Sequence, residues 1–244
     1  MEIAFPDDFD SQVEQAVQHF WDVRENQYNR QHVSGTGDQG LRGAVTGGKQ
    51  LDGFIGIVKN TLVLNGVSSD SIFTDSALEL PGYYRPSKKW DLLIVHNDTL
   101  AAAVEFKSQV GPSFGNNFNN RTEEALGSAV DLWTAYREGV FGIGKAPWLG
   151  YFMLLEDCQK SSIPIRATSP HFDILKEYET ASYKKRYEIF CEKLLLERQY
   201  SGVCFMTTST GDGKAAWSCP EPRLSFRYFL ESLLSDAVIR RTVR

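Results

Sequence analysis

Hydrophobic and polar positions follow two different periods along the chain, and each period predicts one kind of secondary structure. Apolar residues that recur every three or four positions predict helices at 13–21, 126–136, 183–195 and 224–239. Apolar runs or alternation of strand length predict strands at 54–64, 71–78, 148–155 and 202–208. This order favours an α/β fold with a mixed central β-sheet flanked by helices.

A hairpin is predicted in the middle of the chain. Two apolar runs, 92–95 and 101–106, flank the polar residues Asn97, Asp98 and Thr99, which favour a turn. The turn sets the register of the two strands, because side chains alternate between the faces of a sheet with a period of two. Pairing centred on Asp98 is the register that we expect.

Three charged residues at the base of this hairpin, Asp91, Glu105 and Lys107, are the candidate catalytic residues. In the register centred on Asp98, Asp91 stands across from Glu105, and Lys107 shares the face of Glu105. Opposed carboxylates on neighbouring strands have Cβ atoms about 5 Å apart and repel each other unless a cation lies between them. Such hard oxygen ligands favour Mg²⁺, which can also take phosphate oxygens. Lys107 would then meet a phosphate or the attacking water.

The ordinary alternative is that Asp91 merely opens a strand, while Glu105 and Lys107 form an ion pair on a surface edge. The apolar run 101–104 favours the metal site, because a strand that is apolar on both faces is usually buried and charges at its end need a partner. A register slip of one residue would turn Asp91 to the opposite face, so both interpretations stay open.

Two glutamates of the first helix, Glu14 and Glu25, are candidates for an extra carboxylate at this site. Many metal nucleases recruit a carboxylate from an early helix. Ser11 followed by Glu14 also fits a capping box, which is the more common role for such a pair.

The stretch 31–53 is polar and rich in glycine, which predicts a flexible loop. Its G-x-G-x-x-G pattern at 35–40 follows a helix, whereas a dinucleotide site requires a preceding strand. Its segment 43–49 fits the first part of a P-loop, but Gln50 replaces the Ser or Thr that would hold Mg²⁺. A nucleotide-binding regulatory protein that uses this loop is therefore the less favoured alternative.

The strand that carries Lys107 leads into a second polar stretch, 111–121, which is predicted to be a loop near the site. Asn can pair with adenine and Arg with guanine in the major groove, yet asparagine also favours turns for backbone reasons alone, and both interpretations stay open. Together with basic residues from two other segments, this stretch supplies the candidate DNA contacts, which are Lys49, Arg85, Lys88, Lys89, Asn116, Asn117, Asn119, Asn120 and Arg121.

Composition narrows the class of protein. With 42% hydrophobic and 23% charged residues and a mean hydropathy of -0.31, the 244 residues are expected to form a single globular domain over 1–244. No apolar run reaches the roughly 18 residues of a membrane span, and the start lacks the features of a signal peptide, so we expect a cytoplasmic protein. Four cysteines and four histidines show no zinc-site spacing. Because the net charge is -5, local basic patches must carry any binding of phosphate.

The order of an early helix, a hairpin bearing D-x13-E-x-K that begins at Asp91, and then helix and strand resembles the PD-(D/E)xK nuclease superfamily. Trp90 stands where the superfamily name has Pro, a position that varies and does not touch the metal. In its length and in the ending of its first helix, the whole chain resembles type II restriction endonucleases of the XhoI kind. That ending is F-W-x-x-R-x-x-Q, carried by Phe20, Trp21, Arg24 and Gln27.

The resemblance implies a restriction-endonuclease-like core in which Asp91 and Glu105 bind Mg²⁺ and Lys107 is the catalytic lysine. It also implies a homodimer that cuts double-stranded DNA at the palindrome CTCGAG and leaves 5′ overhangs with 5′-phosphate and 3′-hydroxyl ends. A cognate DNA methyltransferase in the same system is implied, without direct contact. A PD-(D/E)xK nuclease of DNA repair or recombination and a catalytically inactive DNA-binding module stay as alternatives.

Overall fold

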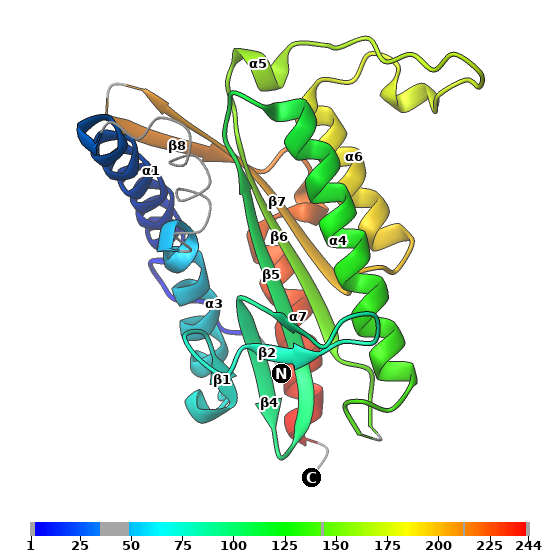
Figure 1. Cartoon of the computed structure of the whole chain (residues 1–244). Helices are drawn as coiled ribbons and strands as arrows, with labels where there is room; N and C mark the ends of the chain where they lie inside the picture. Colours follow the sequence, from blue (N-terminus) through cyan, green and yellow to red (C-terminus); the bar gives the residue numbers. More distant parts are fainter. Residues whose placement is uncertain (1–2, 35–48, 143, 212, 243–244) are drawn as a thin grey trace.

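The computed structural model describes residues 3–34, 49–142, 144–211 and 213–242, and within them a mixed sheet lies between two sets of helices (Figure 1). The strands are β1 (Ile72–Phe73), β2 (Glu79–Pro81), β3 (Ser87–Lys89), β4 (Leu92–His96), β5 (Thr99–Gln109), β6 (Trp148–Glu156), β7 (Gly202–Gly211) and β8 (Lys214–Ser218). The main sheet has the order β1-β4-β5-β6-β7-β8, and β2 pairs with β3 separately. β5, β6 and β7 are parallel, whereas the outer pairs are antiparallel. The predicted α/β fold is confirmed.

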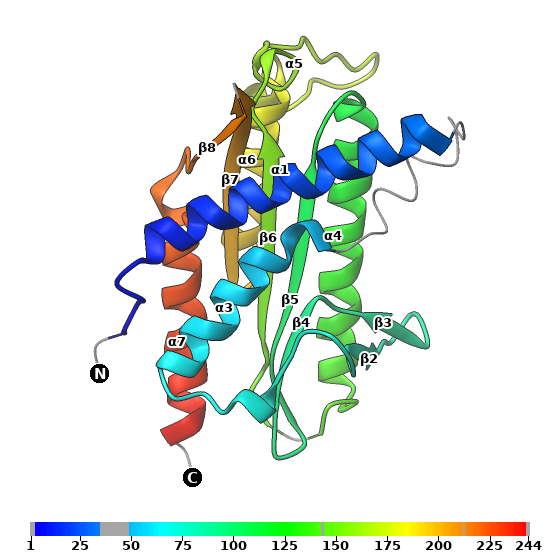
Figure 2. The same cartoon turned by 90° about the vertical axis from the view of Figure 1, so that its left-hand side faces the viewer.

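Long helices cover both faces of this sheet. They are α1 (Phe9–Ser34), α3 (Asp52–Leu64), α4 (Phe114–Arg137), α6 (Tyr183–Leu196) and α7 (Phe226–Thr242). Shorter turns of helix are η1 (Lys49–Leu51), η2 (Ser69–Ser71), α5 (Gln159–Ser162), η3 (Lys176–Tyr178) and η4 (Pro222–Leu224). Figure 2 shows α1 and α3 crossing the same face of the sheet. Across the described ranges, no helix is long and apolar enough to span a membrane.

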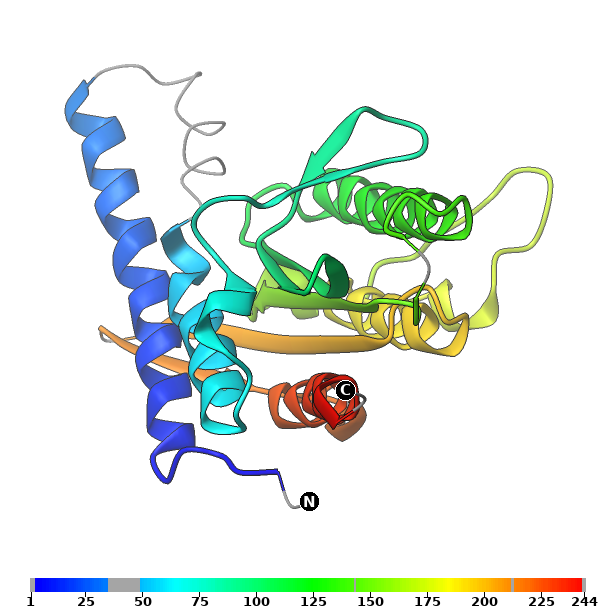
Figure 3. The same ribbon diagram turned by 90° about the horizontal axis from the view of Figure 1, so that it is seen from below.

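Each face of the sheet has its own apolar core, because successive side chains of a strand point to opposite faces. Leu92 and Val104 pack with α1, α3 and α7 on one face. Leu93 and Tyr151 pack with α4 and α6 on the other face. Figure 3, seen from below, shows α1, α3 and α7 on one side of the sheet and α4 and α6 on the other. β6 is buried on both faces over nearly its whole length, as a central parallel strand should be. The strands predicted at β6 and β7 are confirmed.

The strand predicted at 54–64 is wrong, because this segment forms α3. Its buried residues recur with helical spacing, at Phe54, Ile57, Val58, Thr61 and Leu62. Val63 and Leu64 are apolar as well, although they are 44% and 52% exposed. These extra apolar positions hid the helical period and produced a run that resembles a strand.

The loop predicted at 111–121 is also wrong beyond its first residues, because α4 begins at Phe114. Asparagine is a weak helix former. Phe114 stacks on Tyr183 of α6 with ring centroids 5.9 Å apart, and Phe118 meets Tyr187 edge-on at 5.0 Å. Packing against α6 therefore overrides the local preference for a turn.

Smaller differences lie elsewhere in the chain. β1 is much shorter than the strand predicted at 71–78, and Ala77 has a φ of 55°, which interrupts an extended chain. The edge strand β8, which pairs with β7, is not predicted by the pattern. Of the glycine-rich stretch 31–53, residues 35–48 lie outside the described residues, and with them the two glycine patterns apart from Lys49.

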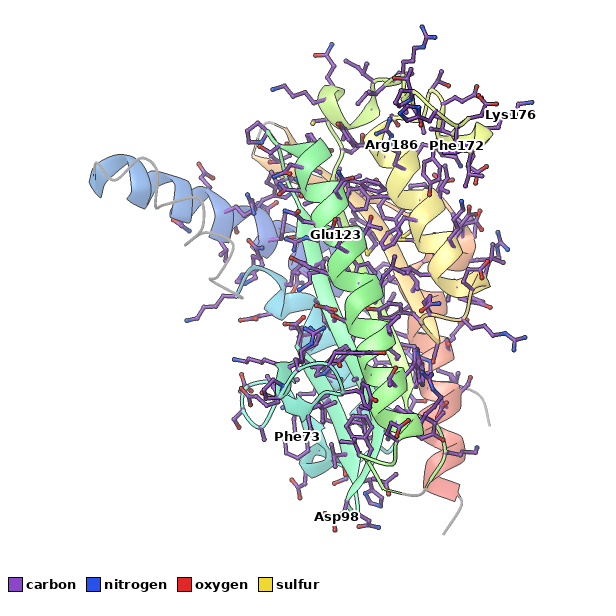
Figure 4. The ribbon with its side chains drawn as sticks, turned by 45° about the vertical axis from the view of Figure 1, so that its right-hand side comes forward. Phe73, Asp98, Glu123, Phe172, Lys176 and Arg186 are labelled. Atoms are coloured by element: carbon purple, nitrogen blue, oxygen red, sulfur yellow. The ribbon has the colours of Figure 1, made fainter. Side chains whose placement is uncertain are left out.

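The β4–β5 hairpin turns at two residues, Asn97 and Asp98, whose φ angles are 48° and 58°. His96 therefore pairs with Thr99, so the register next to the turn is displaced from one that is centred on Asp98. A β-bulge in this strand pair shifts the register by one residue and restores the predicted pairing at the base of the hairpin. Figure 4 shows Asp98 at one end of the molecule and the segment that bears Phe172 and Lys176 at the other.

Candidate active site at the open edge of strand β5

Asp91 and Glu105 face each other where β4 begins. Leu92 is the first residue of β4 and lies opposite Val104, and the Asp91 backbone N–H donates to the Val104 carbonyl at 3.2 Å. Continued by one residue, the register of Leu92 and Val104 sets Asp91 opposite Glu105, which is the pairing that the sequence predicts. β5 continues past this point to Gln109, and there β6 is its partner among the described strands. The two carboxylates therefore lie where one edge of β5 becomes open.

The Asp91 side chain accepts a hydrogen bond from a backbone donor at the start of this open edge. Its Oδ2 accepts a hydrogen bond of 2.7 Å from the backbone N–H of Phe106, in place of the strand that has ended. Burial raises the pKa of Asp91, and the Phe106 N–H and the Lys107 ammonium only partly oppose this effect. Asp91 therefore binds a proton more readily than an exposed aspartate does.

Glu105 is 2% exposed, and two lysines share one of its oxygens. The Nζ atoms of Lys107 and Lys88 lie 2.8 Å and 3.0 Å from Glu105 Oε1. Burial alone would raise the pKa of Glu105, but the ammonium groups of Lys107 and Lys88 outweigh burial and hold the pKa below its usual range. The other oxygen, Oε2, is buried and has no hydrogen-bond partner among the described residues.

Lys88 was a candidate DNA contact by sequence, and the structure places it against Glu105. It comes from β3, and its ammonium group also lies 4.6 Å from the centroid of the Trp90 ring, within the range of a cation–π contact. The Lys88 side chain is 14% exposed. It is therefore a partner of the buried carboxylate.

The β2–β3 hairpin that carries Lys88 is fixed to α4 by the buried Asp131. Asp131 Oδ1 accepts the backbone N–H groups of Tyr83 and Tyr84 at 2.9 Å and 2.8 Å. Asp131 Oδ2 pairs with Arg85 Nε at 2.9 Å. Arg85, another candidate DNA contact, thus has a structural partner within the chain.

The two facing carboxylates fit a hard divalent cation. Carboxylate oxygens are preferred ligands of Mg²⁺, and an unpartnered buried oxygen such as Glu105 Oε2 is costly until a cation or a donor meets it. Over the described ranges, no group of three or more His, Cys, Asp or Glu side chains is arranged to hold a metal. Asp91 and Glu105 would therefore leave most coordination positions to water and phosphate, as Mg²⁺ sites commonly do.

A cavity of about 330 Å³ opens beside Asp91 and Lys107. Its walls come from α1, η1, α3, the end of β5 and the first half of α4. Besides Asp91 and Lys107, its polar and charged lining includes Arg24, Gln50, Asn117, Asn120, Arg121 and Glu124. Three of the candidate DNA contacts thus share one cavity with two of the candidate catalytic residues.

The remaining candidates lie outside this cavity. Glu14 lines a groove between α1 and β8, together with Lys214 and Trp217, and Glu25 is exposed on α1. In the part of the chain that the structure describes, neither glutamate joins Asp91 and Glu105 in a group that could hold a metal. The other candidate DNA contacts are exposed, and they are Lys49, Lys89, Asn116 and Asn119.

Sequence reasoning did not assign Arg24 or Gln50 to the site. Arg24 belongs to the motif at the end of the first helix, and Gln50 is a departure from the P-loop pattern, but neither pattern indicates a shared cavity. Packing of α1 against η1 brings them together, with Arg24 Nη1 donating to Gln50 Oε1 at 3.3 Å. A contact between segments so far apart in the sequence has no local signal.

The chain is similar to proteins of one family. The profile of the restriction endonuclease XhoI family matches residues 30–218. The type II restriction enzyme BstVI of Geobacillus stearothermophilus is 52% identical over 204 residues, which cover 81% of this chain and 91% of that protein. The type II restriction enzyme XhoI of Xanthomonas vasicola is 44% identical over 192 residues, covering 78% and 77% of the two chains.

A third relative, the type II restriction enzyme AbrI of Azospirillum brasilense, is 50% identical over 166 residues, which cover 68% of this chain and 74% of that protein. No solved structure matches. Both the family profile and these relatives extend over most of the chain. The chain therefore belongs to the XhoI family of restriction endonucleases and is a type II restriction enzyme.

Proposed function

We propose that this enzyme cuts double-stranded DNA at the palindrome CTCGAG in a Mg²⁺-dependent reaction and leaves 5′ overhangs. The observation that carries the proposal is the meeting of Asp91, Glu105 and Lys107 at the start of β4: Lys107 pairs with the buried Glu105, and Asp91 and Lys107 line a polar cavity. The target sequence is the one expected for an enzyme of the XhoI kind. The whole chain, 1–244, would act as one restriction-endonuclease-like domain.

Each residue of the site would have a separate role in hydrolysis. Asp91 and Glu105 would hold the cation. The Phe106 N–H fixes one Asp91 oxygen, and Glu105 Oε2 has no protein partner among the described residues and is free to bind the cation. Bound Mg²⁺ lowers the pKa of water and offsets negative charge that develops on the phosphate. Lys107 would donate to the scissile phosphate or orient the attacking water, which stabilises the transition state. Cleavage of the P–O3′ bond would give 5′-phosphate and 3′-hydroxyl ends.

Two copies of the chain would act together. A palindrome has two-fold symmetry, and a homodimer with one site for each strand has the same symmetry. A cognate DNA methyltransferase of the same system would protect the host's own CTCGAG sites without touching this enzyme. The cytoplasm is the proposed location, because the substrate DNA is there.

Cleavage of a long duplex of known sequence tests this proposal. The purified enzyme is incubated with the duplex in Mg²⁺ or in EDTA, and the new ends are sequenced. We expect discrete fragments in Mg²⁺ alone, with CTCGAG at every junction and 5′-phosphate overhangs. Discrete cleavage at another sequence would reject the assigned target, and random nicking or cleavage in EDTA would reject the mechanism.

A further inference from the structure

We infer that the cavity beside Asp91 and Lys107 binds a second phosphate of the cut DNA strand, the one adjacent to the scissile phosphate, through Arg24 and Arg121. The inference rests on the proposed function, because it places the scissile phosphate at Asp91 and Lys107. It assigns a task to two arginines on separate helices, α1 and α4, that line one cavity.

Two contacts within the protein fix the position of the Arg24 guanidinium. Its guanidinium lies 5.8 Å from the centroid of the Phe20 ring, and its Nη1 donates to Gln50 Oε1 at 3.3 Å. Gln50 is 8% exposed, and its Nε2 donates to Ser108 Oγ at 3.0 Å. Ser108 directly follows Lys107 on β5. The side chains of Arg24, Gln50 and Ser108 therefore tie a guanidinium of α1 to the strand that carries the candidate catalytic lysine.

Arg121 approaches the cavity from the opposite wall. Its Nη1 pairs with Glu124 Oε2 at 2.6 Å, and its side chain is 16% exposed. Its Nε is buried and has no hydrogen-bond partner in the part of the chain that the structure describes. A buried donor without a partner is costly, which favours a ligand that supplies an acceptor.

The charges of the cavity favour a phosphate as that acceptor. Arg24, Lys107 and Arg121 carry three positive charges on its lining, against the carboxylates of Asp91 and Glu124. Guanidinium groups present several N–H donors in a planar fork that matches phosphate oxygens. Desolvation lowers the pKa of Arg24, with attraction by Glu156 only partly opposing it, so an anion in the cavity would offset a cost that burial imposes.

The spacing of DNA favours the phosphate next to the scissile one. Phosphates of one strand follow each other at about 3.4 Å along the helix axis. A strand whose scissile phosphate lies at Lys107 would therefore place its neighbouring phosphate within reach of side chains that line the same cavity. The amides of Asn117 and Asn120, on the same wall as Arg121, supply further donors for its oxygens.

The test uses binding in EDTA, so that it does not depend on cleavage. Fluorescence anisotropy gives the Kd of CTCGAG duplexes in which one phosphate at a time is replaced by a neutral methylphosphonate. We expect the replacement next to the scissile phosphate to weaken binding about tenfold in the unaltered enzyme, and to have little further effect in Arg24→Gln or Arg121→Gln. Each variant should also reduce the slope of log K against log salt concentration by about 0.9 for each chain bound to the duplex, on CTCGAG and on unrelated duplexes.

Arg137→Gln is the matched control, because it removes the same charge near the other end of α4, where Arg137 Nη2 contacts Thr134. It should leave both readouts unchanged, and circular dichroism should show all three variants folded. An unchanged methylphosphonate profile in Arg24→Gln and Arg121→Gln would overturn the inference. So would a loss of affinity on 7-deazaguanine substitution that is seen in the unaltered enzyme and disappears in these variants, because it would assign the arginines to a base.

The failure of this inference and that of the proposed function are distinguishable. The enzyme could cut CTCGAG in Mg²⁺ while its methylphosphonate profile and salt slope stay the same in both arginine variants. That result would support the proposed function and reject this phosphate site. An enzyme that does not cut CTCGAG loses the proposed function. In that case an unchanged salt slope on unrelated duplexes would also reject the phosphate contacts, and a reduced slope would support them.

Discussion

Glu105 is a buried carboxylate whose two oxygens differ: Oε1 pairs with Lys88 and Lys107, and Oε2 has no hydrogen-bond partner among the described residues. Its position across from Asp91 was predicted from a pairing centred on Asp98; pairing at the turn is displaced from that centre, and a β-bulge restores the predicted register at the base of the hairpin. Its second ammonium partner, Lys88, could not be predicted, because it comes from the separate β2–β3 hairpin, whose placement depends on a contact with α4. The local pattern thus identifies residues on paired strands, and tertiary packing adds the others.

Replacing Lys107 by alanine tests its proposed role. We expect Lys107→Ala to reduce the single-turnover rate of CTCGAG cleavage by about 10²–10³-fold, because a donor to the developing phosphate charge is lost. Specific binding should stay nearly intact. Lys176→Ala, an exposed change in η3, is the control and should cut normally. Normal cleavage by Lys107→Ala, or loss of specific binding together with cleavage, would contradict the role.

Replacing Lys88 by alanine tests whether it is a structural partner of Glu105. The change removes a charged hydrogen bond to a buried carboxylate and a contact with Trp90. We expect the free energy of unfolding to fall by about 1.5–3 kcal/mol in urea denaturation. Lys89→Ala should change it by less than about 0.5 kcal/mol. Equal stability of the two variants would show that Lys88 is not needed by Glu105 in the folded protein.

At the scale of elements, the predictions failed where packing overrides local pattern. The segment 54–64 carries apolar residues beyond those of its buried face, so its helical period was hidden, and its buried face packs against the apolar side of α1. The asparagines of 111–121 favour turns, yet Phe114 and Phe118 hold this segment as helix against α6. Elements with a clear helical period or an uninterrupted apolar run, such as α6 and β6 respectively, were predicted correctly.

The attachment of the β2–β3 hairpin to α4 gives a prediction at this scale. Asp131→Ala removes the acceptor of two backbone N–H groups and the partner of Arg85, so we expect a loss of about 2–3 kcal/mol in the free energy of unfolding. Amide hydrogen exchange in residues 82–89 should also become faster. Glu123→Ala, an exposed change on the same helix, should alter neither quantity (Figure 4). Unchanged exchange in Asp131→Ala would show that the hairpin is held by other contacts.

At the scale of the whole molecule, an acidic chain can still bind DNA through a local surface. The net charge is -5, but three of the five charged residues that line the cavity are positive. The net charge alone therefore did not predict this positive lining, to which we propose that the DNA strand binds. The cavity gathers residues from α1, η1, α3, β5 and α4, and only the assembled fold brings these segments together.

The proposed two-fold symmetry gives a prediction for the whole assembly. Sedimentation equilibrium should show a species of twice the 27.5 kDa chain mass, because each strand of a palindrome needs its own active site. Binding of the CTCGAG duplex should show two chains for each duplex. A complex with one chain for each duplex would contradict the homodimer.

The central claim is that Glu105 belongs to a metal-dependent cleavage site, and the most direct test is the single-turnover cleavage rate of Glu105→Gln on a CTCGAG duplex in Mg²⁺. Glutamine keeps the shape of the side chain and removes the charge that would hold the cation. We predict a fall of at least about 10³-fold with specific binding in EDTA retained, whereas Glu123→Gln cuts at the unaltered rate. Cleavage by Glu105→Gln at the unaltered rate would contradict the account.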